Sequence, residues 1–403
     1  MSVMAVAMLF IVMPSLSLWG CLMNNQYEHY TMRLTTLAPV FIGDGKELLK
    51  KEYILKDNIV MIPDMRKLYQ VVCNKRAEKE FARFITGGDK DLSFWLRNTG
   101  IGIQPSFIKY QFEVDKAMQR DKKNILTFIK DPYGNPYVPG SSIKGMIRTA
   151  LLAFLVQQEQ RKGSDFIQSK VSQIEQAAFY EDPNQSKVSS KKYLRNEVTG
   201  LENSFFHTLR KVDEKGNKID LKNAVNSILQ GLIISDSKSL QPNDLILAQK
   251  WDVTKDGRET ALPIYRESLK PNVAIDFSLS LNRRIFPFSL KVILAALKQF
   301  NIESNRHFYQ KFGRENKDVN TVYLGGGVGF LSKTVIFPVF QNKGVDMAHM
   351  VFKRTLHSKV YQKHNHHKDL ILRLSPHVCK CTKYKGQLYN MGICRIEEVK
   401  AGF

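Results

Sequence analysis

Four strand-like runs follow one another within residues 232–281, and they restrict the possible folds strongly. The runs are LIISDSKS, DLILAQKWDV, ALPIYRESL and AIDFSLSL, and Pro, Asn, Asp and Gly residues separate them. Apolar and β-branched residues between such turn formers are typical of strands. Residues 287–312 then show a long helical pattern. This part of the sequence therefore predicts one contiguous β-rich region followed by a helix.

The first part of the chain shows a related order of elements. Residues 32–42 predict a strand that ends in a tight turn at residues 43–45, and residues 62–85 predict a helix that begins after a Pro-Asp pair. A strand-like ILTFIK and the turn DPYGNPYVPG follow. Ser141 and Ser142 are then expected to cap an amphipathic helix in IKGMIRTALLAFLVQQ. This order predicts an α+β fold with helices on one face of an antiparallel sheet.

The remaining segments complete a two-part organisation. Polar, charge-rich residues between the two halves predict an inserted helical or mobile segment. After the long helix, YLGGGVGFLSKT predicts a loop, VDMAHMVFKRTLHSKVYQ a second helix, and ILRLS and MGICRIEEV two closing strands. The second half thus repeats the scheme of the first, although no sequence repeat is visible. The expected divisions are an apolar leader at 1–22, a first domain at 23–159, the insertion at 160–230, and a second domain with a glycine-rich loop and a basic tail at 231–403.

The charge balance indicates a polyanionic partner. The chain has 60 Lys and Arg against 38 Asp and Glu, a net charge of +22. Such an excess repels itself in a compact monomer, so nucleic acid is the leading partner class, ahead of an anionic membrane surface. A hydrophobic content of 43% excludes disorder of the whole chain. Five cysteines are too few and too scattered for a disulfide framework, which indicates a reducing, cytoplasmic compartment.

The apolar leader conflicts with this interpretation. Residues 1–25 carry no charged side chain and approach the ~20 apolar residues that a membrane-spanning helix needs. A secretory signal requires a positively charged start and a small-residue cleavage site, and neither is present. Three interpretations stay open: a non-native upstream start with Met23 as the functional start, a membrane anchor, or a disordered apolar leader.

Two glycine-containing loops are the candidate phosphate-binding motifs of the sequence. The first, PGSSIKG at residues 139–145, leads into a helix with Arg148 one turn on. Helix N-terminal N–H groups, serine hydroxyls and basic side chains together bind phosphate. A capped helix with solvated basic residues is the competing interpretation.

The second loop, YLGGGVGFLSKT, has four glycines in five positions, at residues 325–329. Glycine permits positive φ and the close approach of a phosphate backbone. The loop does not match a P-loop, and a lone glycine-rich loop is weak evidence for a nucleotide site, so a flexible connector is the competing interpretation.

Taken together, the two loops resemble the RAMP superfamily of CRISPR effector subunits, and most closely the fifth subunits of type III-A, or Csm, complexes. The supporting segments are LTTLAPVFIGDG, DPYGNPYVPGSSIKGMIRTALL, ISDSKSL, LAQKWDV, LPIYRESL and YLGGGVGFLSKT, which occur in the expected order over most of residues 32–335. The segment before Met23 has no counterpart in this pattern, which favours Met23 as the start. The end of the chain is similar only loosely.

The resemblance implies two RRM-like, ferredoxin-like domains that bind the spacer part of a CRISPR RNA. It further implies a non-catalytic subunit that caps the backbone filament near the 3′ end of the CRISPR RNA and supports 3′-end maturation by recruiting host ribonucleases. The expected partners are the CRISPR RNA, other Csm-type subunits and those ribonucleases; no membrane, cofactor or metal is expected. The RNA-binding residues carried over are Gly140, Ser141, Ser142, Lys144, Arg148, Gly325, Gly326, Gly327, Gly329 and Lys333.

An enzymatic alternative rests on acidic and metal-binding side chains. Asp44 follows the first predicted strand, close to where an RNA-cleaving neighbour in such complexes places its acidic residue, so a metal-dependent endoribonuclease is the alternative function. A carboxylate in a glycine turn is more often a turn former. In the tail, His377, Cys379 and Cys381 can share one face of a strand, and His and Cys are zinc ligands. The same residues also suit an ordinary strand beside a basic surface.

Overall fold

The computed structural model describes residues 26–88, 90–115, 124–180, 189 and 192–399. The apolar leader and the expected start at Met23 lie outside the described residues. The strands are β1 (Tyr27–Thr36), β2 (Gly43–Leu48), β3 (Ile54–Lys56), β4 (Ile59–Pro63), β5 (Ile108–Val114), β6 (Ile125–Phe128), β7 (Leu232–Ile234), β8 (Leu245–Thr254), β9 (Glu259–Leu269), β10 (Ala274–Asn282), β11 (Thr321–Tyr323), β12 (Val378–Tyr384), β13 (Gln387–Asn390) and β14 (Ile393–Glu398).

The α-helices of the described residues alternate with groups of these strands. They are α1 (Met65–Asn74), α2 (Glu78–Thr86), α3 (Leu92–Asn98), α4 (Gly140–Arg161), α5 (Asp165–Phe179), α6 (Arg195–Phe206), α7 (Leu290–His307), α8 (Ile336–Phe340), α9 (Gly344–Thr355), α10 (Ser358–Lys363) and α11 (Asp369–Leu372). Within the described ranges, no helix combines the length and the apolar character needed to cross a membrane.

The strands form two sheets, so the fold is α+β as the sequence predicts. A five-stranded sheet has the order β11-β14-β1-β10-β7, and all its pairs are antiparallel. A nine-stranded sheet runs β2-β6-β9-β8-β5-β4-β3, and β12 pairs with both β8 and β13. Two pairs of this larger sheet, β5 with β8 and β6 with β9, are parallel. The expectation of a purely antiparallel sheet is therefore wrong for this half of the fold.

The four strand-like runs are confirmed as β7 to β10, but they do not stay together. β7 and β10 belong to the five-stranded sheet, whereas β8 and β9 belong to the nine-stranded sheet. The ILTFIK strand, the long helix α7 and the closing strand β14 are also confirmed.

Three local predictions differ from the structure. Residues 43–45 do not form an isolated turn but begin the edge strand β2, whose pairing with β6 shifts register after Gly43. ILRLS is not a strand, because its residues belong to α11 and the turn that follows it. Ile371 is 81% exposed whereas Leu374 is fully buried, so only part of this short run packs into the core. The predicted helices at 62–85 and 345–362 are each divided in two, as α1 with α2 and α9 with α10.

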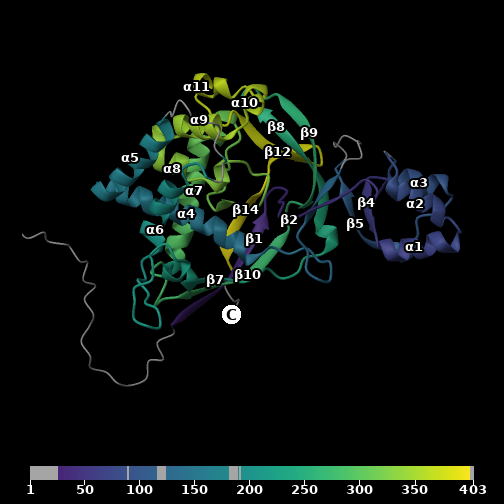
Figure 1. Ribbon diagram of the computed structural model, residues 1–403, viewed down its shortest axis with the longest axis horizontal. Coiled ribbons are helices and arrows are strands. Elements are labelled where there is room, and N and C mark those ends of the chain that lie inside the picture. The colour runs from purple at the N-terminus through teal and green to yellow at the C-terminus, as the bar shows by residue number, and fades with distance from the viewer. Residues whose placement is uncertain (1–25, 89, 116–123, 181–188, 190–191, 400–403) are drawn as a thin grey trace, which may run out of the picture.

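Helices α4 and α7 pack on each other and against the five-stranded sheet. α4 contacts β7 at one edge of this sheet and α7 contacts β11 at the other. Helices α4 to α9 gather on one side of the molecule (Figure 1). The α4 side chains are buried on several faces in the middle of the helix, where the consecutive residues 150–153 are all buried. The sequence predicts an amphipathic helix, and α4 has exposed residues at Ser141, Gly145 and Arg148 in its first turns but is buried more widely further along.

Helices α1 to α3 form a separate projection. They lie at the far end of the molecule from the other helices (Figure 1) and pack on a small core of their own. In this core Phe84 stacks on Trp95 and Phe81 meets it edge-on, with ring centres 5.4 and 5.1 Å from that of Trp95. The sequence does not predict this projection as a separate unit.

Candidate nucleic-acid interface

An open cavity of about 860 Å³ lies where the two glycine-containing loops meet. The start of α4 forms one wall and the loop after β11 forms another. Of the residues predicted to bind RNA, the cavity is lined by Ser141, Ser142, Arg148, Gly325, Gly326 and Lys333. Gly140, Lys144, Gly327 and Gly329 lie outside its lining. The fold therefore brings two motifs that are far apart in the sequence to one site.

Gly140 begins α4 because nothing larger fits there. A Cβ on Gly140 would lie 2.4 Å from the Ile234 carbonyl oxygen and 2.7 Å from that of Ser235. The Gly140 N–H donates to Asp236 Oδ1 at 2.8 Å. The prediction that serine hydroxyls cap this helix is wrong, because Pro139 holds the cap position and makes no side-chain cap bond.

Ser141 and Ser142 do not cap the helix, and both residues line the cavity. Hydroxyls and N–H groups at a helix start suit a phosphate oxygen, and the positive end of the helix dipole favours the same charge. This wall of the cavity is suited to an anion.

Gly325 and Gly326 lie against the backbone of Phe41. The Gly326 N–H donates to the Phe41 carbonyl at 2.7 Å, and a Cβ on Gly325 would lie 2.2 Å from that oxygen. Gly325 also has a φ of +82°, which disfavours other residues. Close packing against Phe41 therefore favours glycine at these positions, whether or not RNA also approaches the loop.

The basic side chains near the cavity differ in their environments. Lys333 is exposed at its rim. Arg148 makes an ion pair with Glu202 of α6, although its side chain stays 51% exposed. Lys144 is half-buried, and burial lowers its pKa. Lys333 is therefore the clearest candidate for a direct phosphate contact.

Residues of the polar insertion complete the cavity. Tyr193, Leu201 and Glu202 line it from the α6 region, and apolar side chains such as Met347 form a deeper part. No sequence pattern indicates this contribution, because only the tertiary packing of α6 and α9 brings these side chains to the loops.

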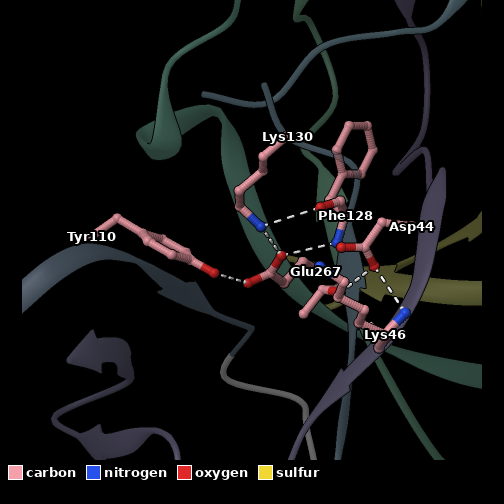
Figure 2. A network of polar contacts seen from close by, with 7 residues as sticks. Asp44, Lys46, Tyr110, Phe128, Lys130 and Glu267 are labelled. Carbon is pink, nitrogen blue, oxygen red and sulfur yellow. Dashed lines mark hydrogen bonds and ion pairs between the residues drawn. The ribbon is translucent and has the colours of Figure 1, made fainter. Parts of the chain in front are cut away.

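Asp44 has local hydrogen-bond partners (Figure 2). Its Oδ1 accepts hydrogen bonds from the Thr127 hydroxyl and from the Lys46 N–H, the latter at 3.0 Å. The carboxylate thereby ties the edge strand β2 to β6. These contacts explain Asp44 as a structural residue of the sheet edge.

The tail contains a group of side chains whose atoms could hold a metal ion. His366, Asp369 and His377 place their ligand atoms within 4.8 Å of one another. Asp369 accepts hydrogen bonds from both imidazoles, and from Ser375 Oγ at 2.7 Å. Burial alone would raise the pKa of Asp369, yet these hydrogen bonds lower it to about 2. The same hydrogen bonds also explain the cluster as a structural one, because they hold residues 366–377 together.

The cysteines of the tail are separate from this cluster. Cys379 and Cys381 share one buried face of β12, as the strand alternation predicts, with their sulfur atoms 3.9 Å apart. Both lie near Asn390 Oδ1. His377 bonds to Asp369 instead, so the possible set of one histidine and two cysteines does not form a common site among the described residues.

The two sheets of the α+β fold, and the two glycine-containing loops that line one cavity, are the features to compare with known protein families. The RAMP superfamily matches residues 33–332, so the chain belongs to this superfamily, which is built from RRM-like, ferredoxin-like units. Relatives that it matches are Csm5 proteins of CRISPR systems. The protein of Mycobacterium tuberculosis is 28% identical over 93% of this chain and 98% of its own length. The protein of Streptococcus thermophilus is 26% identical over 78% of this chain and 82% of its own length.

Solved structures agree on the fold. A chain of a Csm–crRNA–target RNA ternary complex from a type III-A CRISPR-Cas system superposes with a TM-score of 0.63 at 18% identity, covering 92% of this chain and 100% of the other. The crystal structure of T. onnurineus Csm5 gives a TM-score of 0.56 at 18% identity, covering 90% of this chain and 99% of the other. The expected resemblance to fifth subunits of Csm complexes is confirmed.

Proposed function

We propose that the chain is a non-catalytic, CRISPR-RNA-binding subunit of a type III-A effector complex, located near the 3′ end of the guide. The observation that carries this proposal is the cavity in which Ser141, Ser142 and Lys333 face the same space. Hydroxyl, N–H and lysine groups contact phosphate without reading bases. Such contacts suit a subunit that has to accept guides of any sequence.

The relatives support this role and its partners. Proteins matched over most of their length are named Csm5, and a chain of similar fold comes from a complex of Csm subunits with crRNA and target RNA. By this similarity the partners are the CRISPR RNA and other Csm-type subunits, and the location is the cytoplasm. Support of 3′-end maturation through host ribonucleases is part of the same proposal.

Copurification tests the proposal directly. The protein, tagged at its C-terminus and expressed from its own locus, should recover guide RNAs of defined length together with other Csm-type subunits. Sequencing of the RNA ends should show longer guides in cells that lack the protein. Recovery of the protein without RNA would contradict the proposal.

A variant at the rim separates specific contacts from the general charge. Lys333→Ala should weaken binding of single-stranded RNA and lower the salt slope by about 0.7, the value for one phosphate contact. Lys215→Ala is the matched control, since Lys215 is exposed and lies outside the cavity lining. Equal losses from both variants would show that only the overall charge matters.

The enzymatic alternative is tested at Asp44. The purified protein with labelled CRISPR RNA and a divalent metal should leave the RNA intact. Metal-dependent cleavage that Asp44→Asn abolishes would instead identify an endoribonuclease. Because Asp44 has Thr127 and Lys46 as partners, folding of the variant is checked by thermal denaturation.

A further inference from the structure

Three basic side chains lie beneath the glycine-rich loop on one face of the nine-stranded sheet. They are Lys250 on β8, Arg266 on β9 and Lys380 on β12, and β8 pairs with both other strands. The register sets Lys380 opposite Asp252 and Arg266 opposite Ala248, and the alternation of side chains places them on one face. We call Lys250, Arg266 and Lys380 the sheet cation cluster.

Within the described residues, Asp252 is the one carboxylate that forms ion pairs with this cluster. Lys380 Nζ lies 2.9 and 3.0 Å from the two carboxylate oxygens, and Lys250 Nζ lies 3.8 Å from Oδ1. The Lys250, Asp252 and Lys380 side chains are only 18%, 16% and 25% exposed. Two of the three cations therefore pair with one carboxylate in a partly desolvated place, and the third adds to an excess of positive charge.

Arg266 has no ion-pair partner in the described part of the chain. Its Nη1 lies 3.5 Å from Met391 Sδ, and its guanidinium carbon lies 5.3 Å from the centre of the Phe41 ring. The buried Nε makes no hydrogen bond. Burial lowers the pKa of Arg266, and burial together with the charge of Lys380 lowers that of Lys250 to about 8. A buried donor without an acceptor is unfavourable, and a bound anion relieves it.

The glycine-rich loop lies directly on this cluster. Gly327 and Gly329 have φ values of +86° and +104°. A Cβ on Gly327 would lie 2.9 Å from Arg266 Nη1, and one on Gly329 would lie 3.1 Å from Lys380 Cγ. The N–H groups of Gly327, Val328 and Gly329 donate to no other described residue. Successive N–H groups beside cations favour an anion.

We propose that the sheet cation cluster and the backbone of Gly327 to Gly329 form a second phosphate site, which holds the sugar-phosphate backbone of single-stranded RNA. The identification of the ligand as RNA rests on the proposed RNA-binding function. The site itself is distinct from the cavity. Gly325 and Gly326 line the cavity and the next residues of the loop contact the cluster. The loop therefore links two anion sites, and the strand passes from one to the other.

Binding of a labelled, unstructured single-stranded RNA to the full chain tests this site. Arg266→Gln should weaken binding about tenfold and lower the slope of log affinity against log salt by about 0.7, as for one lost phosphate contact. Asp252→Asn removes the neutralising carboxylate and should strengthen binding severalfold. The exposed Lys215→Gln is the matched control and should change neither quantity.

The opposite effects of the two variants keep the test decisive if Arg266→Gln folds poorly. Unchanged affinity and slope in Arg266→Gln and Asp252→Asn, with normal binding by the wild-type protein, would overturn the second site and leave the proposed function intact. Absence of RNA binding by the wild-type protein would overturn both. A gain of affinity in Asp252→Asn with a loss in Arg266→Gln supports the site.

Discussion

Glu267 is a fully buried carboxylate that three neighbours hold in place (Figure 2). Its oxygens accept hydrogen bonds from the Tyr110 hydroxyl at 2.6 Å and from the Phe128 N–H at 2.9 Å, and Lys130 forms the ion pair. Lys130 Nζ also lies 4.8 Å from the centre of the Tyr110 ring. Burial and the adjacent carboxylate raise the pKa of Tyr110, so this phenol stays a donor. The network connects β5, β6 and β9.

Removal of the Lys130 side-chain charge should lower the stability of the fold. Lys130→Met leaves the carboxylate of Glu267 buried without its counter-charge, so the free energy of unfolding should fall by about 3–5 kcal/mol. Urea denaturation measures this loss. The double variant Lys130→Met/Glu267→Gln should recover a substantial part of it, because no buried charge remains. A single variant within ~0.5 kcal/mol of wild type would show that the ion pair does not stabilise the sheet.

Asp369 should make the stability of the tail dependent on acid pH. Its pKa is lowered to about 2 from an ordinary value of 3.8, so its contribution is complete above about pH 4 and is lost as the pH falls toward 2. Asp369→Asn should therefore lower the free energy of unfolding by about 2 kcal/mol at neutral pH. Urea denaturation from pH 7 to pH 3 should show the difference from wild type shrinking below about pH 4. A difference independent of pH would contradict this prediction.

At the scale of elements, the glycine-rich loop is shaped by what lies beneath it. Gly327 combines a positive φ with a close fit, because a Cβ added there would lie 2.6 Å from Met391 Sδ and 2.9 Å from Arg266 Nη1. Gly257 has a φ of +81°, but an added Cβ would have nothing within 4 Å. The two glycines therefore share the backbone requirement and differ in packing.

This pair gives a matched prediction. Gly257→Ala should cost about 1–2 kcal/mol, the penalty for a left-handed conformation. Gly327→Ala should cost more than that and should also weaken RNA binding, since the loop has to move away from Arg266. Thermal denaturation and RNA titration of both variants measure the two effects. Equal losses of stability would show that the contacts of Gly327 do not matter.

Helices and strands with a strong local pattern were predictable, and those that depend on distant partners were not. α7 and β7 to β10 are confirmed because apolar periodicity and turn residues mark them. The run ILRLS has too few residues to separate a strand from a helix by its pattern, and the surrounding hydrogen bonds to Asp369 favour the helical turn. The serines of α4 fit the cap pattern, but the cap position is decided by the close fit of Gly140 against β7.

At the scale of the whole molecule, the net charge of +22 couples stability to RNA. Single-stranded RNA at about 100 times its Kd should add about 2.7 kcal/mol to the free energy of unfolding. The gain should vanish at high salt, because phosphate contacts release counterions. Thermal denaturation at two salt concentrations, with and without RNA, measures it. A gain that is independent of salt would argue against phosphate contacts.

The α+β class, the order of the main elements and the two motifs at residues 139–145 and 325–329 follow from the sequence, because local periodicity and turn chemistry are encoded in neighbouring residues. Three further features depend on the folded chain: the two motifs share one cavity, α6 closes it, and the sheet cation cluster lies beneath the loop. β9 follows β8 directly in the chain, but β12 pairs with β8 across more than a hundred residues of sequence, and that distant pairing leaves no local pattern to detect.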